Sequence, residues 1–491
     1  MPSRSPQDSA EDSAEDTAEN TAQDIAEEIA VPGIERYGAY VPFFRLPLAE
    51  LGGRGERAVA SYDENAVSMA VEAAREALRG FDRESVEALL LSSTSLPYVE
   101  KLNAATVHAA LELPASVLAL DLGGSTRSGL AGLLVGLDLA AAGRTAVVAG
   151  GEVVVGAPSG PREAQGGDAA SAFVVGPGDG AARLIGRASS TEEVLDVWRS
   201  PEMPFARQWE ERFGEGVFVP LLADVLERAL ADAGIEASDL ARVVVDGTSS
   251  RAVGAFLRGA GLKPEQLGEA LQGDVGRSGA AHAGLMLARA LDDAAPGDRI
   301  AVLCAADGAD AAIFEVTEQI TASRPLRSVE RWVSSKRHDL AYTAYLKWRG
   351  VLPFEPPRRP DPARPAAPPM LRSERWKYAF VGSRCDACGA ANLPPQRVCV
   401  ACGEVDRMTP ESFADTPCKI TTYTLDRLAY SLQPPVVAAV VDFENGGRFT
   451  CQLTDVDPEK VGIGDRLEMT FRRLYTAEGV HNYFWKARPQ R

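Results

Sequence analysis

Two patterns of apolar residues alternate along the first two thirds of the chain. Short runs rich in valine, leucine and alanine predict strands, and they alternate with alanine-rich stretches whose apolar residues recur at helical spacing. The stretch 63–79 is one such helix, with Asp63 as its expected cap. Strands are expected at 86–91, 117–122 and 145–149, and further helices near 129–143, 216–234 and 281–293. This alternation predicts a layered α/β fold.

The α/β region also contains an internal duplication. The stretches 145–177 and 299–316 each hold an apolar strand, a turn of small residues, an aspartate followed by two alanines, and a second apolar strand. In the same way, 85–95 is similar to 239–250. Two related halves packed about a pseudo-twofold axis would bring the strand ends of both halves around one central site.

The two flanks of this region differ from it in composition. Residues 1–31 hold nine carboxylates and a single arginine, Arg4. They predict a disordered acidic tail, with a docking segment as the less favoured alternative. Residues 321–370 form the expected linker: 334–350 is a basic-aromatic helix candidate, and the proline-rich 353–370 favours an extended spacer. The α/β domain is therefore placed at 33–320.

Four cysteines after the linker have the spacing of a metal site. Two C-x-x-C pairs place four thiolates, and a glycine follows each pair, which predicts a closed, structural Zn²⁺ site in a zinc ribbon at 371–410. The ligands would be Cys385, Cys388, Cys399 and Cys402. Five strands follow at 418–427, 435–443, 447–455, 466–475 and 480–487, with a turn at Asn445-Gly446. They predict an all-β OB-fold barrel at 411–491.

The charge and hydropathy of the chain limit the classes of molecule that it is expected to bind. Acidic residues outnumber basic ones by 69 to 51, which gives a net charge of −18 and a pI near 4.9. Residues 371–491 carry 16 basic and 15 acidic residues without a basic stripe, so nucleic-acid binding by the ribbon and barrel is the less favoured alternative. No apolar window is long enough for a membrane span, and no secretory signal is present. With cysteines in metal spacing, these features predict a cytoplasmic protein.

A strand-to-helix junction at 116–134 is the candidate reaction site. A strand that we expect to be buried runs into two glycines, then a polar tetrad that includes Ser125 and Thr126, then an apolar helix. Such an elbow aims a side chain and several backbone N–H groups at one point, which suits a nucleophile and an oxyanion hole. The alternative is a plain helix cap by Ser125 or Thr126.

Longer motifs show a resemblance to a known family. GIERYGAYVPFFRL (33–46), DENAVSMAVEAAREAL (63–78), GDAASAFVVG (167–176) and GLMLARALDDAAPGDRIAVL (284–303) resemble the hydroxymethylglutaryl-CoA (HMG-CoA) synthase branch of the thiolase superfamily. The part after the spacer resembles the zinc-ribbon and OB-fold domain, of the DUF35 type, that partners thiolases and these synthases. The resemblance implies a duplicated, five-layer thiolase-type fold and a CoA thioester as substrate or ligand.

Such synthases use a Glu, a nucleophilic Cys, a His and an Asn, and this chain departs from all four. The motifs place these residues on Thr94, Thr126, Asp246 and Arg277, respectively. A threonine hydroxyl titrates far above a thiol and needs an adjacent base, so the usual acyl-cysteine route is not expected. Asp246 could act as that base, and Arg277 suits an anion such as a carboxylate or an enolate oxygen. His282 is the one histidine near these motifs.

Two functional hypotheses follow. In the first, the chain is an acyltransferase-like or condensing enzyme that transfers an acyl group or forms or cleaves a C–C bond, using Asp246, Thr126 or Ser125, Arg277 and Thr94. In the second, the thiolase-type part is catalytically inactive and the chain is a scaffold whose OB fold presents acyl-CoA to a catalytic partner. The resemblance implies a homodimer or a complex with a thiolase-like protein.

Overall fold

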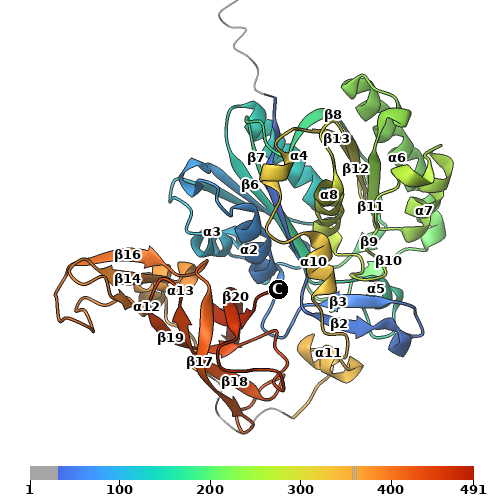
Figure 1. Cartoon of the computed structure of the whole chain (residues 1–491). Helices are drawn as coiled ribbons and strands as arrows, with labels where there is room; N and C mark the ends of the chain where they lie inside the picture. The colour runs from blue at the N-terminus through green and yellow to red at the C-terminus, as the bar shows by residue number, and fades with distance from the viewer. Residues whose placement is uncertain (1–30, 356–357, 359, 361) are drawn as a thin grey trace, which may run out of the picture.

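The computed structural model describes residues 31–355, 358, 360 and 362–491 (Figure 1). The acidic tail predicted for residues 1–31 lies outside the described residues, apart from Val31. Within the described part of the chain, no helix combines the length and the apolar character that a bilayer span requires.

A nine-stranded mixed sheet dominates the N-terminal part of the chain. Its order is β11-β12-β13-β8-β1-β7-β6-β4-β5. The strands are β1 (Gly33–Tyr40), β4 (Ala88–Ser92), β5 (Leu118–Leu122), β6 (Ala146–Glu152), β7 (Ala169–Gly176), β8 (Ala182–Thr191), β11 (Arg242–Gly247), β12 (Arg299–Ala305) and β13 (Gly308–Val316). β1 and β8 pair only at Gly33 and Ile34, so the sheet consists of two halves joined at this point.

Helices separate and cover the two halves of the sheet. They are α2 (Ala66–Ala77), α3 (Ala104–Ala110), α4 (Ser128–Ala141), α6 (Glu211–Ala233), α7 (Ser250–Gly259) and α8 (His282–Asp293). α2 and α3 pack on the half with β4 and β6, and α6 and α7 on the half with β11 to β13. α4 and α8 contact strands of both halves and therefore lie between them (Figure 1). These five layers confirm the predicted duplicated α/β fold.

The duplicated motifs occupy equivalent places in the two halves. β6 and β7 form an antiparallel pair beside the parallel strand β4, and β12 and β13 do the same beside β11. The repeated aspartate has a structural role in each half. Asp168 accepts hydrogen bonds from the backbone N–H groups of Ala60 (2.7 Å) and Val154 (2.9 Å), and Asp310 pairs with Arg127 at 2.7 Å.

Two local predictions about helix and strand ends were wrong. α2 follows the predicted apolar period, but Asn65 caps it, because the Asn65 side chain accepts from the N–H of Ser68. Asp63 is instead buried in a cluster of charges. The strand predicted to be buried at 117–122 is the edge strand β5, on which Leu118 and Leu120 are 48% and 42% exposed.

Short elements surround the site and lead to the linker. They are β2 (Phe44–Pro47), β3 (Glu56–Val59), α5 (Pro161–Gln165), β9 (Val197–Trp198), β10 (Arg207–Gln208), α9 (Ile320–Ser323), α10 (Val329–Ser334) and α11 (Tyr342–Trp348). The single helix predicted over 334–350 is wrong at its first half: the chain leaves α10 at Ser334 and begins α11 only at Tyr342. Residues 335–341 run extended, and Arg337 pairs with β2 through backbone hydrogen bonds.

The C-terminal part forms the predicted ribbon and barrel. Its first elements are α12 (Ala367–Arg372), α13 (Glu374–Ala379), β14 (Val381–Cys385), β15 (Ala391–Asn392) and β16 (Met408–Ser412). The five expected strands follow as β17 (Cys418–Asp426), β18 (Val436–Phe443), β19 (Arg448–Leu453), β20 (Arg466–Ala477) and β21 (Val480–Pro489). They close into a barrel of order β17-β18-β19-β21-β20, as an OB-like fold requires.

The barrel packs against the N-terminal α/β part through buried charges. β20 contacts α2, and the fully buried Arg472 pairs with Asp63 (3.4 Å), Glu64 (2.6 Å) and Asp455 (2.6 Å). Lys486 on β21 pairs with Asp63 at 2.8 Å. Burying charges is costly unless each has a partner, so this network fixes how the barrel sits on α2.

Candidate active site and zinc centre

The five candidate catalytic residues lie near the ends of strands or just before helices. Thr94 follows β4, and Ser125 and Thr126 precede α4. Asp246 is the next-to-last residue of β11, and Arg277 lies in the loop before α8. β4 and β11 hold equivalent places in the two halves of the sheet. The duplication therefore brings segments 150 residues apart to one region of the molecule.

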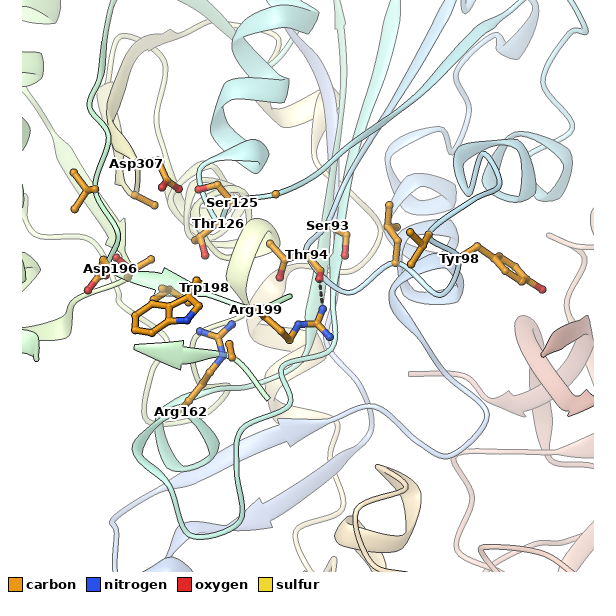
Figure 2. A pocket seen from close by; sticks show the side chains of 18 residues that line it. Ser93, Thr94, Tyr98, Ser125, Thr126, Arg162, Asp196, Trp198, Arg199 and Asp307 are labelled. Carbon is orange, nitrogen blue, oxygen red and sulfur yellow. Dashed lines mark hydrogen bonds between the residues drawn. The ribbon is translucent and has the colours of Figure 1, made fainter. Parts of the chain in front are cut away.

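A cavity of about 300 Å³ lies over the start of α4. Thr94, Ser125 and Thr126 line it, together with Trp198 and Arg199 of the segment that follows β8. Figure 2 shows these side chains around the same space. The Ser125 hydroxyl accepts from the N–H of Arg127 at 3.3 Å, in the turn that leads into α4, whereas Arg127, the residue directly before the helix, makes no side-chain cap. This bond is of the kind that a capping serine makes, so the capping alternative keeps support at Ser125.

A second, smaller cavity of about 50 Å³ adjoins the first. Asp246 and Arg277 line it, and three residues line both cavities: Thr126, Arg162 and Thr248. Thr126 thus stands at the junction, with Thr94 and Ser125 in the larger space and Asp246 and Arg277 in the smaller. All five predicted positions border one composite cavity.

Several buried polar atoms around the smaller cavity have no partner. Asp246 is 3% exposed and its Oδ2 makes no hydrogen bond. Arg277 donates from Nη1 to the carbonyl of Thr248 at 3.3 Å, but its buried Nε and Nη2 atoms have no acceptor. His282 is buried but lines neither cavity, and burial lowers its pKa. Buried polar groups in native proteins are rarely left without a partner, as those of Asp246 and Arg277 are, so their convergence is typical of a ligand site.

Glu152 is a functional candidate that sequence reasoning missed. It ends β6, is 1% exposed, and accepts from Thr94 twice, from the hydroxyl at 3.1 Å and from the N–H at 3.0 Å. The N–H of Ala280 also donates to it, at 3.2 Å. Burial raises the pKa of Glu152, although these hydrogen bonds act in the opposite direction. A single carboxylate at the end of an otherwise apolar strand is the sequence feature that could have identified Glu152.

Asp196 is a second missed residue of the larger cavity. Its side chain is buried, and burial raises its pKa, although the neighbouring Thr248 hydroxyl acts in the opposite direction. Cys304, by contrast, does not line either cavity. It lies on β12 opposite Asp246, is 0% exposed, and burial raises the pKa of its thiol well above the usual range.

The four cysteines of the ribbon form a metal site. The ligand atoms of Cys385, Cys388, Cys399 and Cys402 all lie within 4.8 Å of one another. The Sγ–Sγ distances are 3.7 Å between Cys385 and Cys402 and 3.6 Å between Cys388 and Cys399. Zn–S bonds of about 2.3 Å in a tetrahedron place sulfurs about 3.8 Å apart. The donor set and its spacing therefore fit a zinc ion with a closed, structural shell.

Comparisons with family models match the C-terminal part. Residues 377–406 match the ChsH2 rubredoxin-like zinc ribbon domain, and residues 417–472 match the ChsH2 C-terminal OB-fold domain. These matches agree with the zinc ribbon and the barrel described above.

Curated relatives match the N-terminal part. The hydroxymethylglutaryl-CoA synthase of Aeropyrum pernix is 28% identical over 341 residues, which cover 65% of this chain and 94% of that protein. The hydroxymethylglutaryl-CoA synthase of Methanothermobacter thermautotrophicus is 29% identical over 344 residues, or 65% of this chain and 99% of that protein.

Solved structures show the same fold. MvaS in complex with 3-hydroxy-3-methylglutaryl coenzyme A has a TM-score of 0.56 at 20% identity, covering 68% of this chain and 94% of that chain. The 3-oxoacyl-(acyl carrier protein) synthase III, FabH, from Pseudomonas aeruginosa has a TM-score of 0.53 at 22% identity, covering 58% and 98%.

Proposed function

We propose that this chain, which joins an HMG-CoA-synthase-like, thiolase-type part to a ChsH2-type zinc ribbon and OB fold, is an enzyme that forms or cleaves a C–C bond on acyl-CoA thioesters without an acyl-cysteine intermediate. The observation that carries the proposal is the set of unpartnered polar atoms around the composite cavity. Each such buried atom costs on the order of 1–3 kcal/mol. A catalytically inactive domain would be more stable with apolar residues there, whereas an enzyme needs these groups for its substrate.

The absence of a usable thiol argues for chemistry without an acyl-enzyme. Among the described residues that line the two cavities there is no cysteine. Cys304 is enclosed behind Asp246 on β12, and its raised pKa keeps it a thiol. Thr126 occupies the position of the family nucleophile, but its hydroxyl has no histidine beside it to take its proton. We therefore assign Thr126 to binding the thioester carbonyl.

The remaining groups suit an aldol-type step. Asp246, as base, removes a proton from the carbon next to the thioester carbonyl, and the electron pair moves onto the carbonyl oxygen. The unpartnered guanidinium atoms of Arg277 stabilise this enolate. The enolate carbon then bonds to the carbonyl carbon of a second molecule, whose oxygen takes the electron pair and the proton from Asp246. In the cleavage direction the same atoms move in reverse.

The OB fold is suited to presenting the CoA part of the substrate. Tyr98 lines the larger cavity, and its hydroxyl accepts from the N–H of His481 on β21 at 2.8 Å. The rings of Tyr98 and His481 also lie 5.0 Å apart. The barrel therefore reaches the cavity mouth, which supports a role for it in holding a thioester that extends outwards.

Proton exchange tests the proposal without knowledge of the second substrate. The purified chain is incubated with acetyl-CoA or propionyl-CoA in D₂O, and mass spectrometry follows deuterium at the carbon next to the carbonyl. We expect catalysed exchange, which Asp246→Asn reduces at least about a hundredfold because the base is lost. Asp224→Asn, an exposed aspartate on α6, is the matched control. Intact mass should show no acylated protein.

A scaffold function is the second candidate, and the exposed edge of β5 favours it. Leu118 and Leu120 of β5 and Val135 of α4 are all more than 40% exposed, and β5 pairs on one side only, with β4. This edge would accept a strand from a second copy or from a thiolase-like partner. If the isolated chain gives no exchange but restores thioester turnover to a co-purified thiolase, the scaffold function replaces the enzyme. Exchange by the isolated chain that Asp246→Asn abolishes excludes it.

A further inference from the structure

Two arginines outside the predicted catalytic set point into the composite cavity. Arg162 lies on α5 and lines both cavities, and Arg199 follows β9 and lines the larger one. Figure 2 shows the Arg162 guanidinium between the Trp198 indole and Arg199. No motif or periodicity in the sequence associates these two residues, because they belong to separate segments of the chain.

Neither arginine forms an ion pair with a carboxylate of the described residues. Within the part of the chain that the structure describes, no carboxylate lies within ion-pair distance of Arg162, Arg199 or Arg277. Arg199 donates only to the backbone carbonyl of Thr94, at 3.1 Å, and the buried Nε of Arg162 has no acceptor. Burial lowers the pKa of Arg162, and the charges of Arg199 and Arg277 lower it further. Arg162 is half-buried and Arg199 is exposed, and neither forms an ion pair of the kind that joins the buried Arg57 to Asp168.

Three carboxylates line the two cavities, Asp196, Asp246 and Asp307, and among the described residues none of them forms an ion pair with these arginines. Glu152 lines neither cavity; its charge acts on Arg162, but its oxygens accept from Thr94 and Ala280. Figure 2 shows the Trp198 indole between Asp196 and the Arg162 guanidinium, and Asp196 forms no ion pair with any described residue. The composite cavity therefore has, next to Thr126, a cationic side whose arginines are not ion-paired with the carboxylates that also line it.

We propose that Arg162 and Arg199 bind a free carboxylate on the acyl part of the substrate, so that the enzyme acts on CoA thioesters of dicarboxylic acids. The inference rests on the proposed function for the identity of the reacting thioester. Arg162 lines the junction at Thr126, where the thioester carbonyl would lie, so the anion it binds belongs to the acyl part and not to the CoA phosphates. A planar guanidinium is the side chain best shaped to bind a carboxylate with two parallel hydrogen bonds.

Matched pairs of thioesters test the proposal by binding alone. Malonyl-CoA and succinyl-CoA differ from propionyl-CoA and butyryl-CoA only in carrying a carboxylate in place of a methyl group. Titration calorimetry on the full chain should give Kd values at least about tenfold lower for the carboxylated member of at least one pair. Arg162→Gln should remove this preference without changing the Kd of the uncarboxylated member. Arg162→Lys should restore part of it.

Controls separate the alternatives. Arg258→Gln, an exposed arginine on α7, should leave every Kd unchanged. Circular dichroism and the thermal midpoint establish that Arg162→Gln is folded. Equal affinities within both pairs would overturn the proposal. Equal weakening of both members of a pair by Arg162→Gln would also overturn it, because the arginine would then bind the CoA phosphates. A carboxylate preference without α-proton exchange would reject the proposed reaction and keep this carboxylate subsite. Exchange without a carboxylate preference would keep the reaction and reject the subsite.

Discussion

Replacing Arg472 by methionine is the sharpest test of how the barrel is held on the thiolase-type part. Arg472 on β20 is 0% exposed and lies within 2.6 Å of oxygens on both Glu64 and Asp455. Methionine keeps the length of the side chain and removes its charge. Lys486 still pairs with Asp63, but Asp455 keeps only Arg488, at 3.9 Å.

The expected loss follows from the carboxylates left behind. Removing one partner of a buried ion pair typically costs about 3–5 kcal/mol, and we expect a loss of free energy of unfolding in this range at pH 7. The matched control is Arg448→Met on β19, which removes an exposed pair with Asp442 at 2.6 Å. A surface pair contributes about 0–1 kcal/mol, so the control should unfold almost as the native chain does.

The pH dependence gives the prediction a second, independent part. Burial alone would raise the pKa of Asp63, but the charges of Lys486 and Arg472 lower it to about 2. Because the folded pKa lies below the unfolded value, Asp63 stabilises the native chain above about pH 4, and this contribution is lost as the pH falls through 2. Burial already raises the pKa of Glu64 to about 7 in the native chain, and the charge of Arg472 opposes this rise, so removing Arg472 raises the pKa of Glu64 further. A carboxyl whose folded pKa lies above its unfolded value destabilises the chain at high pH, so the deficit of the variant shrinks as Glu64 is protonated between pH 7 and 5.

Urea unfolding, followed by far-UV circular dichroism at pH 7 and pH 5, measures both parts. Limited trypsin digestion reports release of the barrel, because a loosened interface exposes Arg75 of α2, which is buried and donates to the carbonyl of Met469 on β20. A stability for Arg472→Met equal to that of Arg448→Met would refute the reasoning. So would a deficit that grows on acidification, since the cost would then come from lost packing and not from unpaired charge.

Three further predictions concern the metal, the site and the exposed edge. Cys399→Ser should abolish binding of zinc, measured by atomic emission on dialysed protein, because the tetrahedral shell loses a thiolate; full retention of zinc would contradict the site. Thr126→Val keeps the shape of the side chain and should lower α-proton exchange about 10- to 100-fold with an unchanged thermal midpoint, whereas unchanged exchange would exclude a role for the hydroxyl. We expect the native chain to have the mass of a dimer in light-scattering measurements and Leu120→Lys on β5 to have that of a monomer; a native monomer or a mass that the substitution leaves unchanged would contradict an interface at this edge.

The fold could be predicted largely from local pattern. The apolar period of α2, the strands β4 and β6 and the five barrel strands were predicted within a few residues, because burial of one face imposes its spacing on the sequence. The errors lie where a tertiary contact overrides the local signal. Asp63 has the residue type of a helix cap, but Lys486 and Arg472 from the barrel bind it, and Asn65 caps instead.

The site was predictable only in part. Thr94, Thr126, Asp246 and Arg277 were identified by alignment with the motifs of a known family, and all four border the composite cavity. Glu152 and Arg162 were not identified, because a lone charged residue at a strand end or on a short helix has no period and no motif.

The sequence by itself determined the elements, the duplication and the zinc ligands, because each is encoded in residues close together along the chain. Only the tertiary structure decided which charges meet. The sheet order places the ends of β4, β6 and β11 around the start of α4, and it leaves Arg162 and Arg199 facing one cavity without a carboxylate partner. Electrostatic interactions depend on distance in space and not on separation in sequence, so this property of the protein exists only in the folded chain.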